Sequence, residues 1–451
     1  MFKIPELLEA TQGKLVSPGG NIPVKGISID SRSVRKGEAF IAIKGERFDG
    51  HDFIARAIKN GASCIITQRE VKSAGAVFIR VKDTTKALGD IARFNRNRFS
   101  NIPVIAVSGS NGKTTVKEMV AWVLSKKFKV LRNEGTKNNQ IGLPLTLLKL
   151  DSSYDLAVLE IGTNHFGEVG YLSNIAQANI GIITNIGPAH LEYFKNLKGV
   201  FKEKYTLVKK LTKPAVAILN ADDKFLRGEV QKPKKIPFTV GAGLRNRSDF
   251  YASDIKYICG KASFTVNQRF KFALNALGYY NIQNSLLAIA AGRIFGLGYR
   301  DLSSRLAKFR LPKSRLNFIE IKGIRFIDDT YNSNPLSMKQ ALGVLGSFSV
   351  KGRKILVMGD MLELGSLSRP LHAEVLKDAL KFSDALITVG ALTKSCLDKN
   401  IKAKNNIFTC KTSSEAREAL FNNVRVNSDD IVLVKGSRGM RMEEVFKVET
   451  R

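Results

Sequence analysis

Short apolar runs and amphipathic stretches alternate through the middle of the chain. Apolar runs of strand length occupy 102–107, 155–162, 180–187 and 215–223, and the stretch at 116–128 has helical spacing. Continuous apolar runs are typical of strands buried on both faces, because helices cover both sides of a parallel sheet. The pattern therefore predicts a central parallel sheet with helices on both faces.

The segments on either side of this pattern predict two further α/β units. Before it, four short apolar runs surround one helical stretch, 53–60, as in a small α/β domain. A polar turn with a proline at 97–103 and the pair Leu311-Pro312 are expected to be the junctions. After the second junction the apolar runs resume, at 318–327, 354–358, 385–389 and 431–434.

The expected fold class is α/β with three domains. They span residues 1–98, 99–312 and 313–451, with a P-loop parallel-sheet domain in the middle and a Rossmann-like domain at the end. Within the middle domain, the apolar spacing shortens to two residues at 253–272, which predicts a hairpin. A helix is expected to follow at 281–295.

Composition narrows the class of protein. The 451 residues are 44% hydrophobic and 25% charged, which is typical of globular chains and excludes disordered, collagen-like and coiled-coil proteins. No apolar run approaches the roughly 18 residues of a membrane helix, and the N-terminus does not resemble a secretory or transit leader, so a cytoplasmic protein is expected. The four cysteines and four histidines have no zinc-binding spacing, and buried reduced thiols are expected.

The formal net charge of +32 favours anionic ligands. However, no lysine block is longer than two residues, and no RNA-binding signature of aromatic and basic residues is present. Most of the charge is therefore expected to be solvated surface with some attraction for nucleotides, and no nucleic-acid partner is expected.

A glycine-rich loop, SGSNGKTT at 108–115, stands directly between a predicted strand and a predicted helix. Glycines allow backbone N–H groups to face phosphate oxygens, a lysine reaches the outer phosphates, and a threonine hydroxyl binds Mg²⁺. Val107 stands where the usual spacing has glycine, so the loop is a shortened form, and a glycine-rich turn with a chance lysine is the alternative. The predicted nucleotide-binding residues are Gly109, Ser110, Asn111, Gly112, Lys113, Thr114 and Thr115.

Two candidate metal ligands follow neighbouring predicted strands. Glu160 ends the strand predicted at 155–160, and His190 follows the strand predicted at 180–184 after a short loop that contains Asn185 and Pro188. Because the carboxyl ends of parallel strands meet at one edge of a sheet, both side chains are expected near Thr114. The alternatives are that Glu160 caps a turn and that His190 starts a helix. No zinc cluster, nucleophile elbow or dinucleotide fingerprint competes with ATP or GTP chemistry.

Several longer motifs resemble those of the Mur ligases, the ATP-dependent amide-forming enzymes of peptidoglycan precursor synthesis. They are EIGTNHFGE at 160–168, IDDTYNSNP at 327–335, GDMLELG at 359–365 and VKGSRGMRME at 434–443, with DSR at 30–32 and KGERFDGH at 44–51 near the N-terminus. The resemblance covers nearly the whole chain. It implies a UDP-binding first domain, an ATP-binding second domain and a third domain that closes on the nucleotide and the incoming dipeptide.

Within the family, the motifs are most similar to those of the branch that adds D-Ala-D-Ala to UDP-N-acetylmuramoyl-tripeptide. The implied reaction moves the γ-phosphoryl group of ATP to the tripeptide carboxylate, and the dipeptide amine then attacks the acyl phosphate. The implied partners are these small molecules, and a monomer is expected. The alternatives are a sister Mur ligase, a ligase like folylpolyglutamate synthase, or a non-catalytic nucleotide-regulated binding protein.

The resemblance also implies roles for individual residues. Lys113, Glu160, His190 and Lys204 are the implied catalytic residues, and Thr114 and Glu160 would share one Mg²⁺ while His190 helps to hold a second. Lys204 would be carbamylated and bridge toward the second ion, because an unmodified lysine would repel it. The sequence Lys204-Tyr205-Thr206 departs from the family's usual Lys-Gly-Glu, and a surface-helix lysine is the alternative.

The remaining implied residues are ligand-binding. The nucleotide-binding set adds Asn284, Arg315, Asp329 and Asn332, and the substrate-binding set is Ser31, Arg32, Asn138, Asn139, Lys435 and Arg438. Polar turns, loop caps and surface ion pairs are the alternatives for several of these. Tyr280 stands where the family usually has histidine.

Overall fold

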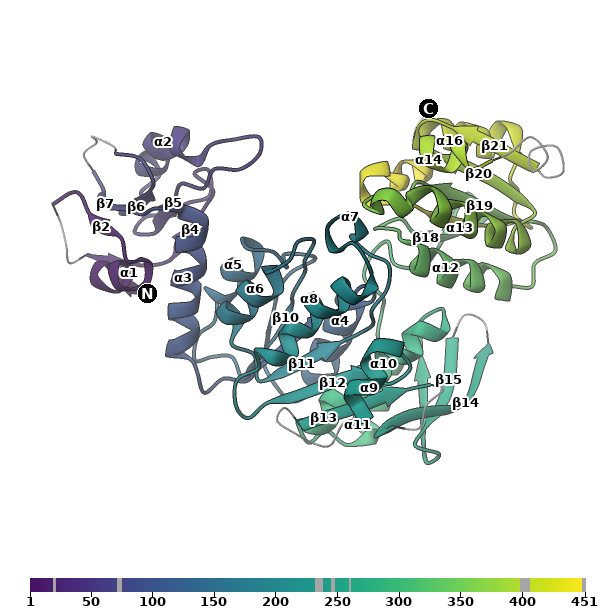
Figure 1. Cartoon of the computed structure of the whole chain (residues 1–451), viewed down its shortest axis with the longest axis horizontal. Coiled ribbons are helices and arrows are strands. Elements are labelled where there is room, and N and C mark those ends of the chain that lie inside the picture. The colour runs from purple at the N-terminus through teal and green to yellow at the C-terminus, as the bar shows by residue number, and fades with distance from the viewer. Residues whose placement is uncertain are drawn as a thin grey trace.

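A computed structural model describes residues 1–18, 22–70, 75–231, 238–244, 248–258, 261–397 and 406–447. The chain forms three lobes, each built on its own main sheet, which we call the N-terminal, central and C-terminal lobes (Figure 1). The predicted α/β class is therefore confirmed. In Figure 1 the N-terminal and C-terminal lobes stand on opposite sides of the central lobe and leave an open space between them.

The N-terminal lobe contains a five-stranded sheet that is parallel except at one edge. Its order is β2 (Lys14–Leu15), β7 (Val77–Arg80), β6 (Cys64–Thr67), β5 (Ala39–Ile41) and β4 (Ile27–Ser28). The strands β1 (Phe2–Lys3) and β3 (Pro23–Val24) form a separate pair, and η1 (Gly50–Phe53) with α2 (Ile54–Lys59) occupies the predicted helical stretch.

The long helix α3 (Thr84–Arg98), which the sequence pattern did not single out, connects this lobe to the central one. It packs against α1 (Ile4–Thr11) on the N-terminal side and against α5 (Gly142–Leu147) and α6 (Glu168–Ala176) on the central side. Leu88 and Ile91 belong to the N-terminal core, whereas Ala92 belongs to the central core.

The central lobe contains a nine-stranded sheet that is parallel except at one edge. The parallel part has the order β14 (Phe250–Ile258), β13 (Phe238–Gly243), β12 (Val216–Asn220), β11 (Ile180–Ile183), β8 (Val104–Ser108), β10 (Leu156–Glu160) and β9 (Val130–Arg132). Beyond β14 lie β15 (Lys261–Val266) and β16 (Phe270–Leu274), and the β14–β15 and β15–β16 pairings are antiparallel. The predicted hairpin is thus part of a three-stranded antiparallel meander at this edge of the otherwise parallel sheet.

Helices cover both faces of the central sheet, as the pattern predicted. One face carries α4 (Lys113–Leu124), α10 (Tyr279–Ile294) and α11 (Tyr299–Ala307), and the other carries α5, α6, α8 (Leu197–Lys209) and α9 (Lys224–Gln231). Along β8, Ile105 and Val107 enter the first core while Val104 and Ala106 enter the second. A strand buried on both faces explains the uninterrupted apolar run at 102–107.

The C-terminal lobe contains a six-stranded sheet. Its order is β17 (Asn317–Ile321), β18 (Ile324–Asp329), β22 (Ile431–Lys435), β19 (Lys354–Gly359), β20 (Ala385–Val389) and β21 (Asn406–Cys410). Helices α12 (Pro335–Ser347) and α13 (Ser368–Phe382) cover one face, and α16 (Ser413–Glu418) lies on the other. The predicted single strand at 318–327 is a hairpin, because Lys322 and Gly323 have positive φ and reverse the chain.

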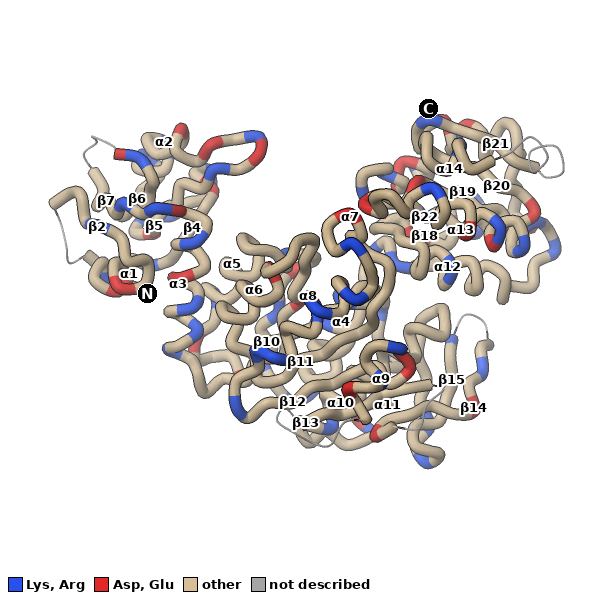
Figure 2. Tube along the Cα trace, viewed as in Figure 1, with Lys and Arg blue, Asp and Glu red and all other residues tan. Residues whose placement is uncertain are grey.

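The chain carries a large basic excess, with 72 Lys and Arg residues against 40 Asp and Glu residues. Lys and Arg are distributed over all three lobes (Figure 2). None of the helices in the described part of the chain combines the length and apolar character that crossing a bilayer requires. Cys64 and Cys410 are buried free thiols and Cys396 is partly buried, whereas Cys259 lies outside the described residues.

Candidate active site

The glycine-rich loop joins the end of β8 to the start of α4, at the carboxyl edge of the central sheet. Gly109 and Gly112 have φ values of +141° and +80°, in the region that favours glycine. A Cβ atom on Gly109 would lie 2.0 Å from Thr184 Oγ1, so no larger residue fits there. The backbone can therefore turn tightly around an anion in front of the α4 N-terminus.

Lys113 is the first residue of α4, and its side chain folds back over the loop. Its Nζ donates hydrogen bonds to the carbonyl oxygens of Gly109 at 3.0 Å and Ser110 at 3.2 Å. Burial lowers the pKa of Lys113; Glu160 opposes this shift and Arg315 adds to it. An anion in the loop would thus give this ammonium a partner of opposite charge.

The turn after β11 is hydrogen-bonded to the glycine-rich loop. Ser110 Oγ donates to the carbonyl of Gly187 at 3.0 Å and accepts from its N–H at 2.9 Å. Asn185 accepts from the Asn111 N–H through Oδ1 and donates to the Asn111 carbonyl through Nδ2, both at 3.0 Å. These contacts hold the segment that leads to His190 against the phosphate loop.

Glu160 ends β10, directly beside β8, and is 1% exposed. Its Oε1 accepts a hydrogen bond from Asn138 Nδ2 at 2.7 Å. Its Oε2 is buried and has no hydrogen-bond partner among the described residues. A buried carboxylate oxygen without a partner is costly, so this atom is a candidate ligand for a cation.

Lys204 lies on the inner face of α8 and is completely buried. Its Nζ has no hydrogen-bond partner within the described part of the chain. Burial holds the pKa of Lys204 well below its usual value, Lys113 adds to the shift, and Glu203 opposes it. The alternative of a surface lysine is therefore wrong, and the environment favours a neutral amine.

His190 adopts a left-handed conformation, with φ of +53°, at the start of α7 (Leu191–Phe194). Its Nδ1 lies 2.5 Å from Oε2 of Glu363, which belongs to the C-terminal lobe. The contact with His190 lowers the pKa of Glu363 against the opposing effect of burial. His190 thus starts a helix, which was the alternative interpretation of this residue. It also connects the central and C-terminal lobes at the site.

Two further contacts bring the C-terminal lobe onto the phosphate loop. Arg315 donates from a guanidinium nitrogen to Thr114 Oγ1 at 3.0 Å and stacks 4.1 Å from the Tyr331 ring centroid. The amides of Asn111 and Asn334 exchange two hydrogen bonds, at 2.6 and 3.3 Å. Asn334 was not predicted to be a site residue, because its partner is 223 positions away along the chain.

The other predicted residues of the C-terminal lobe form one connected group. Lys435 is 2% exposed, and its Nζ donates to Asp329 Oδ2 at 2.6 Å and to the Asn332 carbonyl at 2.9 Å. The N–H of Arg438 donates to Asn332 Oδ1 at 3.3 Å, while its guanidinium pairs with Glu443 at 2.9 Å. The buried ammonium of Lys435 is thus already neutralised within the lobe.

These residues line one cavity of about 720 Å³ between the lobes. The predicted residues in its wall are Ser110, Asn111, Gly112, Lys113, Thr114, Thr115, Asn138, Asn139, Glu160, His190, Asn284, Arg315, Asp329, Asn332, Lys435 and Arg438. Asn284 faces the loop, since a Cβ atom on Gly112 would lie 2.8 Å from its Oδ1. Asn139 caps the turn into α5 through Oδ1, which accepts from the N–H groups of Ile141 and Gly142.

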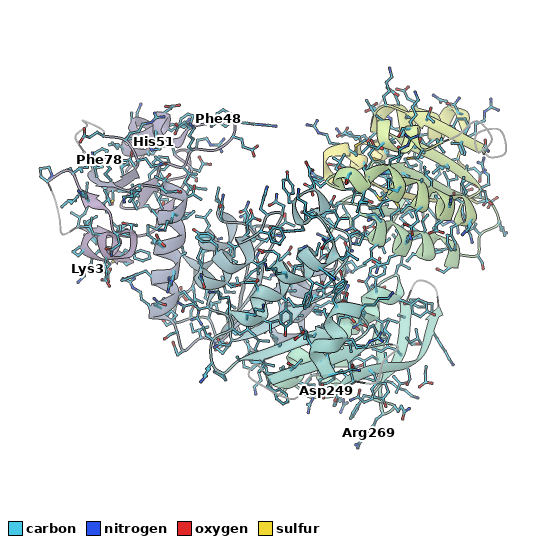
Figure 3. The ribbon with its side chains drawn as sticks, in the orientation of Figure 1. Lys3, Phe48, His51, Phe78, Asp249 and Arg269 are labelled. Carbon is cyan, nitrogen blue, oxygen red and sulfur yellow. The ribbon has the colours of Figure 1, made fainter. Side chains whose placement is uncertain are left out.

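Four predicted residues are not part of this cavity wall. Gly109 and Lys204 belong to the central lobe, whereas Ser31 and Arg32 belong to the N-terminal lobe, where Arg32 pairs with Asp30 at 2.8 Å. That lobe contributes Glu46 to the wall. Figure 3 places Phe48, which is 72% exposed, at the end of the same loop on the side that faces the other lobes.

The fold and the site together define a class of nucleotide-dependent enzyme, in which a glycine-rich loop, a buried carboxylate and residues of a third lobe meet at one cavity. Three models of the Mur ligase family match the chain: the "Mur ligase family, catalytic domain" at 23–96, the "Mur ligase middle domain" at 107–292 and the "Mur ligase, glutamate ligase domain" at 314–438. The chain belongs to the Mur ligase family.

Individual relatives are similar to this chain over nearly its full length. The chain is 32% identical to the UDP-N-acetylmuramoyl-tripeptide–D-alanyl-D-alanine ligase of Bacillus subtilis, over 98% of this chain and 97% of that protein. A crystal structure of MurF from Acinetobacter baumannii superposes with a TM-score of 0.89 at 33% identity, covering 98% and 97% of the two chains. MurF ligase from Thermotoga maritima, in complex with ADP, gives a TM-score of 0.82 at 29% identity, covering 94% and 96%.

Proposed function

We propose that this chain is an ATP-dependent ligase that joins D-Ala-D-Ala to UDP-N-acetylmuramoyl-tripeptide in peptidoglycan precursor synthesis. The observation that carries the proposal is full-length similarity to ligases named for this reaction, in a chain whose phosphate loop, Glu160 and Lys113 share one cavity. No observation specifically favours a sister ligase or a non-catalytic binding protein. A monomeric, cytoplasmic enzyme stays a prediction.

The loop residues of the central lobe would bind and orient the triphosphate of ATP. The backbone N–H groups of 109–115 and the α4 N-terminus would face its phosphates, and Lys113 would move from the loop carbonyls to the γ-phosphate. The tripeptide carboxylate attacks the γ-phosphorus, and ADP leaves. The dipeptide amine then attacks the acyl carbon and loses a proton, inorganic phosphate leaves, and a peptide bond forms. Lys113 and Arg315 would offset the negative charge that develops during transfer.

The residues present fit a Mg²⁺ site that is completed by the nucleotide. No group of three or more His, Cys, Asp or Glu among the described residues could hold a metal ion by itself, whereas Mg²⁺ typically takes one or two carboxylates together with substrate phosphates. Glu160 Oε2 and the Thr114 hydroxyl would hold one ion, and His190 with carbamylated Lys204 a second. Bound Mg²⁺ would supply charge neutralisation at the phosphates.

The remaining predicted residues would bind the other substrates. We propose that the units 1–98, 99–312 and 313–451 bind the UDP group, ATP and the dipeptide respectively. Ser31 and Arg32 would contact the UDP group, and Asn138 and Asn139 the entering UDP-peptide. Asn284, Asp329 and Asn332 would bind the nucleoside of ATP, and Lys435 and Arg438 would orient the dipeptide when the third unit closes.

Phosphate release by the purified full-length chain tests this proposal. With ATP, Mg²⁺, UDP-N-acetylmuramoyl-tripeptide and D-Ala-D-Ala, release is expected to be rapid, and omission of any one component is expected to lower it to background. Mass spectrometry should detect the UDP-N-acetylmuramoyl-pentapeptide. Equal release without the dipeptide, or with glutamate in its place, would reject the assigned reaction.

The contact between Asn111 and Asn334 gives a prediction about lobe closure. Asn334→Ser keeps a good N-cap for α12 but removes the amide that pairs with Asn111. The loss of two hydrogen bonds is expected to raise the KM for ATP roughly tenfold, while the melting temperature changes little. A KM equal to that of the wild type would show that this pair does not hold the closed arrangement.

A further inference from the structure

The side chain of Asn133 continues the hydrogen bonding of the central sheet at the position of Glu160. Strand β9 pairs with β10 only as far as Arg132 opposite Val158, so β9 ends before it reaches Glu160. Asn133 Oδ1 accepts from the Glu160 N–H at 2.9 Å, and its Nδ2 donates to the Glu160 carbonyl at 3.2 Å. The amide thus replaces the missing peptide group of a neighbouring strand.

Asn133 is completely buried and also holds the loop that follows it. Its Nδ2 donates to the Lys137 carbonyl at 3.0 Å, next to Asn138. The Asn138 carbonyl accepts from the Gly162 N–H at 2.9 Å, beyond Glu160. The segment 133–138 is therefore fastened to the end of β10 at Glu160 itself and at Gly162, two residues beyond it.

Lys117 fixes the same segment from α4, one turn after Lys113. Its ammonium is completely buried and donates to the carbonyls of Asn133 at 2.6 Å and Gly135 at 3.3 Å. It also lies 2.6 Å from Glu118 Oε1. Burying a lysine costs free energy that an apolar residue would avoid, so these contacts point to a requirement for a fixed backbone here.

In this arrangement the two oxygens of the Glu160 carboxylate differ in their hydrogen bonding. Asn138, placed by the fastened segment, donates to Glu160 Oε1 at 2.7 Å, and Oε2 is left buried with no hydrogen-bond partner among the residues that the structure describes. We propose that Asn133 and Lys117 are positioning residues, which set the Glu160 carboxylate so that Oε2 faces a divalent cation. The inference deepens the proposed function and rests on its assignment of Glu160 as a metal ligand.

The test measures cation binding apart from turnover. Mn²⁺ is titrated into the intact protein in the presence of ADP, and free Mn²⁺ is followed by electron paramagnetic resonance. Asn133→Ala is expected to weaken Mn²⁺ binding by 10- to 100-fold, as for other residues that orient metal ligands. The Mg²⁺ concentration for half-maximal phosphate release should rise in parallel, while kcat at saturating Mg²⁺ and the KM for D-Ala-D-Ala stay within about twofold.

Asn95→Ala is the matched control, because Asn95 is another buried asparagine that donates two side-chain hydrogen bonds, at 3.0 and 3.1 Å, but away from the cavity wall. It is expected to lower the melting temperature without changing Mn²⁺ affinity. Lys117→Met, which leaves the Asn133 side chain in place, is expected to weaken Mn²⁺ binding at least fivefold. If Asn133→Ala does not fold, this second variant tests whether the segment positions Glu160 for the cation.

Unchanged Mn²⁺ affinity in the folded variants, or an equal change in Asn95→Ala, would overturn the inference. Failure of the proposed function has a different signature, because the wild-type protein would then release no phosphate with the four reaction components.

Discussion

Replacing Lys113 with alanine is expected to lower kcat for phosphate release by about 10³-fold, the usual cost of removing a donor that stabilises transition-state charge. Among the described residues, this ammonium has only the carbonyls of Gly109 and Ser110 as hydrogen-bond partners, so its charge is available to an incoming phosphate. Burial, which lowers its pKa, also means that little water competes for it. The variant is measured by phosphate release at saturating ATP and by ADP binding.

The control for this variant is Lys126→Ala, since Lys126 follows α4 but its side chain is 51% exposed. That change is expected to leave kcat within twofold of the wild type. Lys113→Arg is expected to recover little activity, because the planar guanidinium does not fit the space of an ammonium folded over the loop. If the Lys113→Ala enzyme kept more than one tenth of the wild-type kcat, the transferred phosphate would have to bind away from Lys113, and the assignment of this residue would be wrong.

The part of the site that lies on neighbouring strands could be predicted from the sequence. The loop follows β8, Glu160 ends β10 and His190 comes after β11, and these three strands are adjacent and parallel. Adjacent parallel strands place the loops that follow them at one edge of the sheet. The apolar runs and their order along the chain were therefore sufficient to predict that these site residues lie together. The position of Thr114 near Glu160 follows from the same rule.

Contacts between distant segments could not be predicted in this way. Asn133, Asn185 and Asn334 are polar residues in loops, and their partners depend on how the lobes and turns pack rather than on local spacing. The role of Glu363 likewise depends on the approach of the C-terminal lobe to His190. The resemblance to a known family pointed to the motifs that contain Asn334 and Glu363 but not to these pairings.

Tyr280 illustrates a third case, in which the sequence showed a departure but not its consequence. The side chain lines the cavity and packs against the core of the C-terminal lobe beside Leu277 and Leu316. Burial raises the pKa of Tyr280, and the nearby carboxylate of Asp329 adds to the shift. A neutral aromatic side chain therefore occupies the junction of the two lobes where the family usually has histidine.

Replacing Lys204 is expected to lower kcat by about 100-fold or more, because the proposed carbamate is a metal ligand. Carbamate forms when the neutral amine attacks the carbon of CO₂ and loses a proton. Since burial holds the pKa of Lys204 far below its usual value, the amine is neutral above that lowered pKa and protonated below it. Activity is therefore expected to fall as the pH falls through the lowered pKa, and added bicarbonate is expected to move this fall to lower pH.

Two variants separate loss of the carbamate from loss of the fold. Lys204→Ala leaves a space in which acetate or formate can supply a carboxylate, so these ions are expected to restore part of the activity. Lys204→Met fills that space and should not respond. The free energy of unfolding of the Lys204→Met variant should equal or exceed that of the wild-type protein without the carbamate. Between the lowered and the usual pKa the unfolded chain binds one more proton at Lys204, so burial of this amine opposes folding there.

Carbon-13 NMR with labelled bicarbonate gives the direct measurement. A carbamate signal is expected in the wild type and in Lys202→Ala, whose side chain is exposed on the same helix, and not in Lys204→Met. Absence of the signal from an active wild-type enzyme, or full activity in Lys204→Ala without added carboxylate, would remove Lys204 from the metal site. The buried amine, which has no hydrogen-bond partner in the described part of the chain, would then need another explanation, because such burial costs stability that an apolar residue would not.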